Sequence, residues 1–358
     1  MKLRAIEKRR RKPTLTVALP RTLEGLPEFV SAGKMWAHLS KELQQIGCDI
    51  EYLEPRGRGR FGRRPDVWLV DGHLGSIEAN APVVAHLHEA PWVEGVAEHH
   101  LDPEFCEAGW AASDAAIRQA SMVITPSEFS REQVVRVHGV AADRVRAVPH
   151  GVDGRMFNPS RRRAGEDFIR RHGVSGPYVL FVSVLHPRKN LAALRDAMTI
   201  LAGEGLPHAL IMVVSPAADR QDYDSFLVEA SAPLPKRSTQ VVTLMRLSEV
   251  DLASVMAGAS ALCAPSLSEG FGLTPLEAMA SGTPVVVSNR GALPEVVGSA
   301  GLVVEPDADA IASALRSVLG DDRLAKTLGN AGRGRSELFT WESAARGWRA
   351  VLEEASRS

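Results

Sequence analysis

The chain has 358 residues, more than a single hydrophobic core usually organises, so two domains are expected. Hydrophobic residues make up 45% and charged residues 24%, a composition that excludes disordered and fibrous classes. The formal net charge is -1, so the chain as a whole has no electrostatic attraction to nucleic acid or to an anionic membrane. We therefore expect no nucleic-acid partner.

Local features refine this picture. Residues 2–12 hold seven basic side chains against one Glu, which favours a solvated tail, with peripheral contact to an anionic membrane surface as the alternative. The three cysteines are widely spaced and form no CxxC pair, so a reducing cytoplasm is expected. No apolar run reaches about 18 residues and no signal-peptide pattern is visible, so neither a spanning nor an export segment is expected.

Short β-rich apolar runs alternate with segments of helical periodicity, the pattern of parallel βαβ units. In the first half, strands are predicted at 14–20, 48–55, 66–72, 82–89, 121–127 and 145–151, with helices at 33–47 and 128–139. The pattern then restarts, with strands at 178–185, 209–215, 240–247, 261–266, 283–289 and 300–306 and helices at 190–205 and 307–320. The fold class is α/β, with two doubly wound sheets.

An Arg-rich polar segment near residues 150–165 separates the two strand sets and predicts the boundary between domains. We expect an N-terminal domain over 1–160 and a C-terminal domain over 161–340, with the helix 341–358 packing back on the first. Open α/β sheets bind ligands outside the carboxyl ends of their strands, so the active site is expected between the domains.

Residues 264–289, APSLSEGFGLTPLEAMASGTPVVVSN, are the most informative stretch. A strand end leads through a glycine-containing turn into a helix, with Thr274 as the expected N-cap and Pro275 at the first helical position. Such a helix N-terminus binds anions, because its unpaired amides and positive dipole end converge there. The amides of Gly272, Leu273 and Thr274 are candidates for holding a phosphate.

Glu269 and Glu277 flank this turn, and a carboxylate there can accept hydrogen bonds from sugar hydroxyls. Each has an alternative interpretation. Thr274 and Glu277 have the spacing of a capping box, in which the Glu reaches back to the amide of the cap residue. Glu269 would otherwise be a solvated loop carboxylate.

The Glu-x7-Glu motif with GFGLTPLEAMASGTPVV resembles the donor site of the retaining glycosyltransferases of family 4. PHGVD at 149–153, FVSVLHPRKN at 181–190 and SNRGALPEVVG at 288–298 follow in that family's order. The resemblance implies the GT-B fold of two facing Rossmann-like domains. It also implies retaining transfer of a hexose from a nucleoside diphosphate sugar to a hydroxyl acceptor, with GDP-mannose slightly favoured over a UDP-hexose.

Arg188 and Lys189 follow a predicted strand end and precede a helix, where adjacent cations suit a diphosphate. An isolated pair of this kind would more often be a basic cap on a solvent face. The family usually has Gly-Arg or Gly-Thr where this chain has Ser183-Val184. If the family's additional arginine is needed, Arg188 must supply its charge.

The resemblance adds further candidate residues. His88 corresponds to the family histidine that orients the transferred sugar, and His86 shares its strand face. Gly33 and Lys34 stand where many relatives carry a Gly-Gly loop for acceptor or phosphate, although a small-residue turn before a helix explains them as well. The remaining candidates for donor binding are Gly270, Phe271, Met245 and Arg246.

We expect no metal and no other cofactor. Neither of the two acidic pairs, Asp222 with Asp224 and Asp307 with Asp309, follows an obvious strand end in a plausible position, and Arg188, Lys189 and a helix N-terminus already provide positive charge. A dehydrogenase is unlikely because its G-x-G-x-x-G turn is missing after the first strand. A non-catalytic nucleotide-sugar-binding or scaffold protein of the same fold is the other interpretation.

Overall fold

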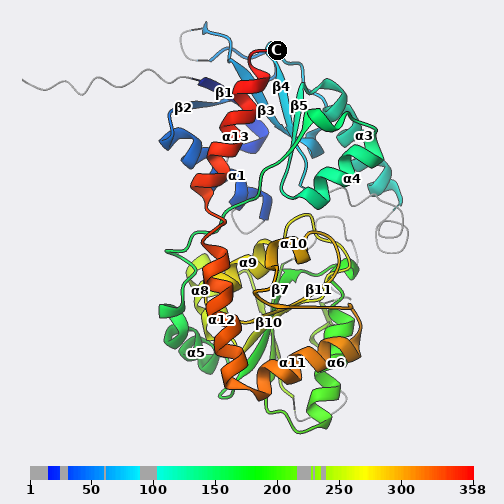
Figure 1. Cartoon of the computed structure of the whole chain (residues 1–358), viewed down its shortest axis with the longest axis vertical. Coiled ribbons are helices and arrows are strands. Elements are labelled where there is room, and N and C mark those ends of the chain that lie inside the picture. Colours follow the sequence, from blue (N-terminus) through cyan, green and yellow to red (C-terminus); the bar gives the residue numbers. More distant parts are fainter. Residues whose placement is uncertain are drawn as a thin grey trace, which may run out of the picture.

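The computed structural model describes residues 15–24, 31–59, 62–88, 103–215, 227–228, 230–234 and 239–358. The basic segment 2–12 and the pair Asp222 and Asp224 lie outside these residues. The chain forms two α/β halves stacked along the long axis of the molecule (Figure 1). Within the described residues, no helix combines the length and the apolar character needed to cross a membrane.

The first half contains a parallel six-stranded sheet in the order β2-β1-β3-β4-β5-β6. Its strands are β1 (Leu15–Pro20), β2 (Cys48–Leu53), β3 (Val67–Asp71), β4 (Val83–His86), β5 (Met122–Thr125) and β6 (Val145–Ala147). Its helices include α1 (Ser31–Gln45), α3 (Pro103–Gln119) and α4 (Glu128–His138). The central strands β3, β4 and β5 are buried along their whole length, as expected where helices cover both faces.

The second half repeats this plan in the order β12-β11-β10-β7-β8-β9. Its strands are β7 (Tyr178–Val184), β8 (Ala209–Ser215), β9 (Val241–Met245), β10 (Ala261–Ala264), β11 (Val285–Ser288) and β12 (Leu302–Val304). Its helices include α5 (Arg162–Arg171), α6 (Leu191–Gly203), α8 (Glu249–Gly258), α9 (Leu273–Ala280), α10 (Leu293–Val297), α11 (Ala308–Gly320) and α12 (Asp322–Ser336). The predicted α/β class with two parallel sheets is confirmed.

The strand order explains where a ligand site can form. Read from β9, the strands of the second sheet follow the order third, second, first, fourth, fifth and sixth of their half. The strands β7 and β10 are therefore neighbours at the point where the order reverses. In the first sheet the order reverses between β1 and β3. Segments that leave neighbouring strands at such a point diverge and open a crevice at the carboxyl edge of the sheet.

The last helix, α13 (Trp341–Ala355), packs against α1 and belongs to the core of the first half. Trp348 is fully buried and meets Trp36 edge-on, with ring centroids 5.8 Å apart. Figure 1 shows this red helix rising from the second half to lie along the first sheet. The chain thus passes between the halves near residue 150 and again near residue 340, where Val152 and Thr340 form a β-bridge.

Candidate active site

A cavity of about 710 Å³ lies between the two halves. The first half contributes residues from α1, from the ends of β3 and β4 and from the crossing near residue 150. The second half contributes the segments that follow β7, β9 and β10. Most of the predicted site residues line it: Lys34, His88, Arg188, Lys189, Arg246, Glu269, Gly270, Phe271, Gly272, Leu273, Thr274 and Glu277. Met245, with 43% of its surface exposed, and Gly33 are not among the lining residues.

Helix α9 starts at a different residue from the one that the sequence predicted. Helix α9 begins at Leu273 with Gly272 as the N-cap, so Thr274 and Pro275 already lie inside the helix. The reason is the positive φ of 105° at Gly272, which turns the chain into the helix two residues early. No side chain caps α9, so the first amides of the helix, including those of Leu273 and Thr274, have no cap acceptor.

The Gly270 carbonyl group, which precedes this turn, is hydrogen-bonded to the first half. Ser127 and Ser130, at the start of α4, donate hydrogen bonds from Oγ to the Gly270 carbonyl oxygen at 2.7 and 3.0 Å. Beside them, the Glu295 carboxylate of α10 accepts hydrogen bonds from the backbone N–H groups of Glu128 and Phe129 at 3.1 and 3.2 Å. These contacts hold the turn into α9 at a fixed place relative to the first sheet.

Arg188 and Lys189 lie in a single turn of 3-10 helix between β7 and α6. Lys189 Nζ donates to Glu269 Oε1 at 2.7 Å, and Ser266 Oγ donates to the same oxygen at 2.8 Å. Arg188 donates to the Ser268 carbonyl at 3.2 Å. Burial would raise the pKa of Glu269, but Lys189 and Arg188 outweigh it and hold the pKa below its usual value. Glu269 is therefore an ionised and paired group and not a solvated loop carboxylate.

Lys34 crosses the cavity to Glu277. Its Nζ lies 2.5 Å from Glu277 Oε1 and 2.8 Å from Glu249 Oε1. The capping-box interpretation of Glu277 is thus wrong, because its carboxylate faces Lys34. Burial raises the pKa of Glu277 and Lys34 only partly opposes this effect. For Lys34, burial would lower the pKa, but the two glutamates raise it, so the amine stays charged.

Gly33 and Lys34, the candidates for an acceptor or phosphate loop, lie in helix α1, in agreement with the helix predicted from residue 33. Both residues lie in the first turn of α1, which begins at Ser31. The small residues here start a helix, because the run Ser31-Ala32-Gly33 continues directly into the amphipathic face of α1. Lys34 consequently reaches the cavity as a helical side chain with a fixed direction.

His88 follows β4 and is held by an acidic residue that sequence reasoning missed. Its Nε2 lies 3.0 Å from Asp71 Oδ2, and Asp71 also accepts hydrogen bonds from Trp36 Nε1 at 3.1 Å and from the His73 amide at 3.0 Å. Burial would raise the pKa of Asp71, but His88 and the nearby histidines hold it far below its usual value. The signal for Asp71 was its place at the end of β3, the strand beside β4.

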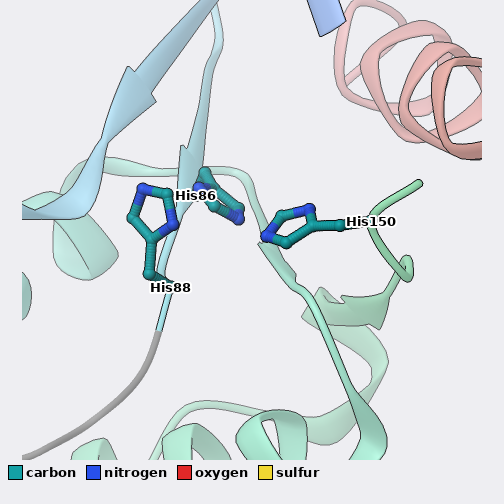
Figure 2. Close-up of side chains that lie close together, drawn as sticks. All are labelled: His86, His88 and His150. Atoms are coloured by element: carbon teal, nitrogen blue, oxygen red, sulfur yellow. The ribbon is translucent and has the colours of Figure 1, made fainter. Parts of the chain in front are cut away.

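His86 and His150 complete a group of three imidazoles with His88 (Figure 2). His150 lines the cavity and meets Phe271 edge-on at 5.2 Å between ring centroids. Burial lowers the pKa of His150 to about 3 and that of His86 well below its usual value. Both rings are therefore neutral near pH 7.

Asp307, one member of the acidic pairs considered for a metal, has a structural role. Asp307 caps α11 by accepting a hydrogen bond from the Ala310 amide at 2.8 Å.

Arg246, which follows β9, adopts a positive φ of 52° and lies at the cavity wall. Met245, its neighbour in the chain, does not line the cavity.

Two facing doubly wound sheets with the cavity between them define the GT-B class of architecture. The solved structure of Anabaena HepE in complex with UDP and glucose superposes with a TM-score of 0.73 at 20% identity, covering 95% of this chain and 100% of that one. At this level of identity, the likeness establishes the fold alone.

Sequence comparisons identify the family. Residues 165–335 match Glycosyl transferases group 1, and residues 67–154 match Glycosyltransferase Family 4. Together these matches cover most of the chain, which belongs to glycosyltransferase family 4.

Two characterised relatives are mannosyltransferases. The MMP alpha-(1->4)-mannosyltransferase of Mycolicibacterium hassiacum is 33% identical over 66% of this chain. The GDP-mannose-dependent alpha-(1-6)-phosphatidylinositol dimannoside mannosyltransferase of Mycobacterium tuberculosis is 30% identical over 64% of it. The alignments span 55% and 57% of the length of these relatives.

Proposed function

We propose that this protein transfers a hexose from a nucleoside diphosphate sugar to an acceptor hydroxyl, with retention of configuration at the anomeric carbon. The observation that carries this proposal is the convergence of Arg188, Lys189 and the N-terminus of α9 on one cavity at the reversal point of the second sheet. Two side-chain cations and free helix amides are the groups that bind a diphosphate. Family membership supports the same reaction class.

Charge builds up on the departing diphosphate as the glycosidic bond breaks. Arg188, Lys189 and the first amides of α9 are already positioned and partly shielded from water, so they stabilise this charge without reorganising. No divalent metal is needed at the diphosphate under this proposal, because the protein supplies the positive charge. The acceptor oxygen bonds to the anomeric carbon on the face from which the diphosphate departs, and the leaving phosphate oxygen takes the acceptor's proton. Attack on that face retains the configuration.

The carboxylates and His88 act on the sugars. Glu277, at the far end of the α9 first turn, accepts hydrogen bonds from the ribose hydroxyls, and Glu269 accepts from the hexose. His88, fixed by Asp71, orients the hexose from the first half. We favour GDP-mannose over a UDP-hexose because two relatives are mannosyltransferases and one of these is named as GDP-mannose-dependent.

The test begins with a thermal-shift screen of GDP-mannose, UDP-glucose and their free nucleotides. A ligand at 100 times its Kd stabilises the folded state by about 2.7 kcal/mol. The preferred donor is then incubated with candidate hydroxyl acceptors in EDTA, and NMR coupling constants give the anomeric configuration of the product. An inverted product would contradict the retaining mechanism. Donor binding without transfer or hydrolysis would favour the non-catalytic alternative.

A further inference from the structure

Three histidines lie close together at the carboxyl edge of the first sheet. His86 ends β4, His88 follows two residues later, and His150 lies beyond the end of β6. Because β5 pairs with both β4 and β6 in parallel, their carboxyl ends meet at one edge of the sheet. One ring nitrogen of each histidine lies within 4.8 Å of the others, and Figure 2 shows the three rings turned toward a common point.

His86 has an unusual environment for a polar ring. It is fully buried and contacts Trp36 and Trp348, with ring centroids 5.8 and 4.7 Å away. Neither of its nitrogens has a hydrogen-bond partner among the described residues. Buried polar groups without partners are rare in native proteins and call for an explanation, of which a bound ion is one.

His88 is prepared as a ligand by its carboxylate partner. Its Nε2 is turned toward Asp71, which therefore holds the proton on Nε2 and leaves the lone pair on Nδ1. This is the arrangement found around metal-bound histidines, where a carboxylate fixes the tautomer and the ring orientation. Asp71 itself is anchored by Trp36 and by the His73 amide.

We propose that His86, His88 and His150 bind a divalent transition-metal ion of the Zn²⁺ type, with an open fourth coordination position toward the cavity. Neutral imidazole nitrogens suit such ions, whereas Mg²⁺ and Ca²⁺ prefer oxygen ligands. His88 and His150 line the cavity while His86 lies behind them, so the side left open faces the cleft. Three histidines with one free position are typical of a reactive zinc site.

Binding of the ion requires only that the three imidazole rings move slightly closer together. Tetrahedral ligands at the usual Zn–N distance of about 2.0–2.1 Å lie about 3.4 Å apart. The nitrogens of the histidines, now within 4.8 Å of one another, would therefore approach by up to about 1.4 Å. The site is separate from Arg188 and Lys189, so it is compatible with a diphosphate held without metal. A bound ion would, however, occupy Nδ1 of His88, the ring nitrogen that is left for the hexose in the proposed function.

The experiment titrates Co²⁺, and then Zn²⁺ in competition, into the metal-stripped full chain without nucleotide sugar. We expect one equivalent of Co²⁺ with the intense visible absorption of tetrahedral coordination, displaced by Zn²⁺. His150→Asn removes one ligand with little change in volume and should abolish the absorption. Asp71→Asn keeps an acceptor for His88 but loses the charge, and should weaken binding about 10–100-fold.

The matched control is His208→Asn. His208 is also a buried histidine with an unpartnered Nδ1, but it precedes β8, at the opposite edge of the second sheet. This variant should bind Co²⁺ like the parent chain. Binding by the parent chain that is no tighter than in His150→Asn, or equal loss in His208→Asn, would overturn the proposal. Because no sugar donor is present, the outcome is independent of whether the chain transfers a hexose.

Discussion

Lys34 and Glu277 are 243 residues apart in the chain and form an ion pair 2.5 Å long that joins α1 of the first half to α9 of the second. The pair lies at the cavity wall, and Lys34 also rests 4.4 Å from the ring centroid of Phe157. In the proposed function Glu277 binds the donor ribose, so the amine that opposes the effect of burial on the pKa of this carboxyl group belongs to the other domain. Donor binding is thereby linked to the relative position of the two halves.

Replacing Lys34 should make donor binding pH-dependent. Burial raises the pKa of Glu277 and only Lys34 opposes it directly, so Lys34→Met should raise that pKa further. As the pH falls through the raised value, Glu277 gains a proton and loses acceptor capacity for ribose. The Kd for the donor nucleotide should increase about 10–100-fold between pH 8 and pH 5.5, since hydrogen bonds to charged groups contribute about 1.5–3 kcal/mol.

Isothermal titration of the free nucleotide over that pH range measures this effect. The parent chain should show a much flatter profile, and Glu277→Gln should bind weakly at every pH because it has no carboxyl to titrate. An equally flat profile in Lys34→Met would contradict the assignment of Glu277 to the ribose.

Lys189→Ala should lower kcat about 10²–10³-fold, by analogy with the loss of one oxyanion-hole donor. The lysine lies 2.7 Å from Glu269 and faces the cavity where the diphosphate is proposed to leave. Arg316→Ala is the control, because Arg316 forms an exposed surface pair with Glu204 far from the cavity. It should retain full turnover.

Removal of Lys189 also leaves Glu269 with less positive charge around it, which could destabilise the fold. A thermal melt of each variant separates this effect from catalysis. Glu269→Gln together with Lys189→Ala removes both charges and should recover stability but not turnover. Near-normal turnover in a folded Lys189→Ala variant would exclude the proposed role of the lysine.

Gly272→Ala should reduce both stability and nucleotide binding. The residue has φ of 105°, and an added Cβ would lie 2.9 Å from Leu293 Cδ2. Strained backbone of this kind costs about 1–3 kcal/mol in the free energy of unfolding. Chemical denaturation measures the change, and Gly334→Ala provides the matched control. Gly334 lies on the exposed face of α12 with open space around it, so the substitution should stabilise by about 0.5–1 kcal/mol.

Trp348→Ala should destabilise the first half by about 3–5 kcal/mol, the usual cost of removing a large buried aromatic. Trp348 is fully buried between α1 and the first sheet, although it stands near the end of the chain. Leu338→Ala, at a side chain with 69% exposure, should change stability little. Circular dichroism with a guanidinium titration checks both. Equal stability of the two variants would mean that α13 is not needed for the first core.

Much of the fold could be predicted because its signals are local. All twelve strands lie within the predicted ranges, since buried parallel strands such as β7 and β8 appear as continuous apolar runs between turn residues. The residues of the second half that line the cavity could be predicted for a similar reason. Arg188 and Lys189 follow one strand, Glu269 and Gly272 follow another, and the reversal of strand order makes these strands neighbours.

The partners of these residues were decided by the tertiary structure. The sequence gives Glu277 the local spacing of a capping box, yet the approach of α1 provides Lys34 as a stronger partner, and Gly272 starts the helix too early for Thr274 to act as its cap. His150 joins His86 and His88 only because β4 and β6 flank β5. Short-range hydrophobic patterns therefore determined which elements form, whereas the packing of two sheets on either side of one cavity determined which charges and imidazoles meet.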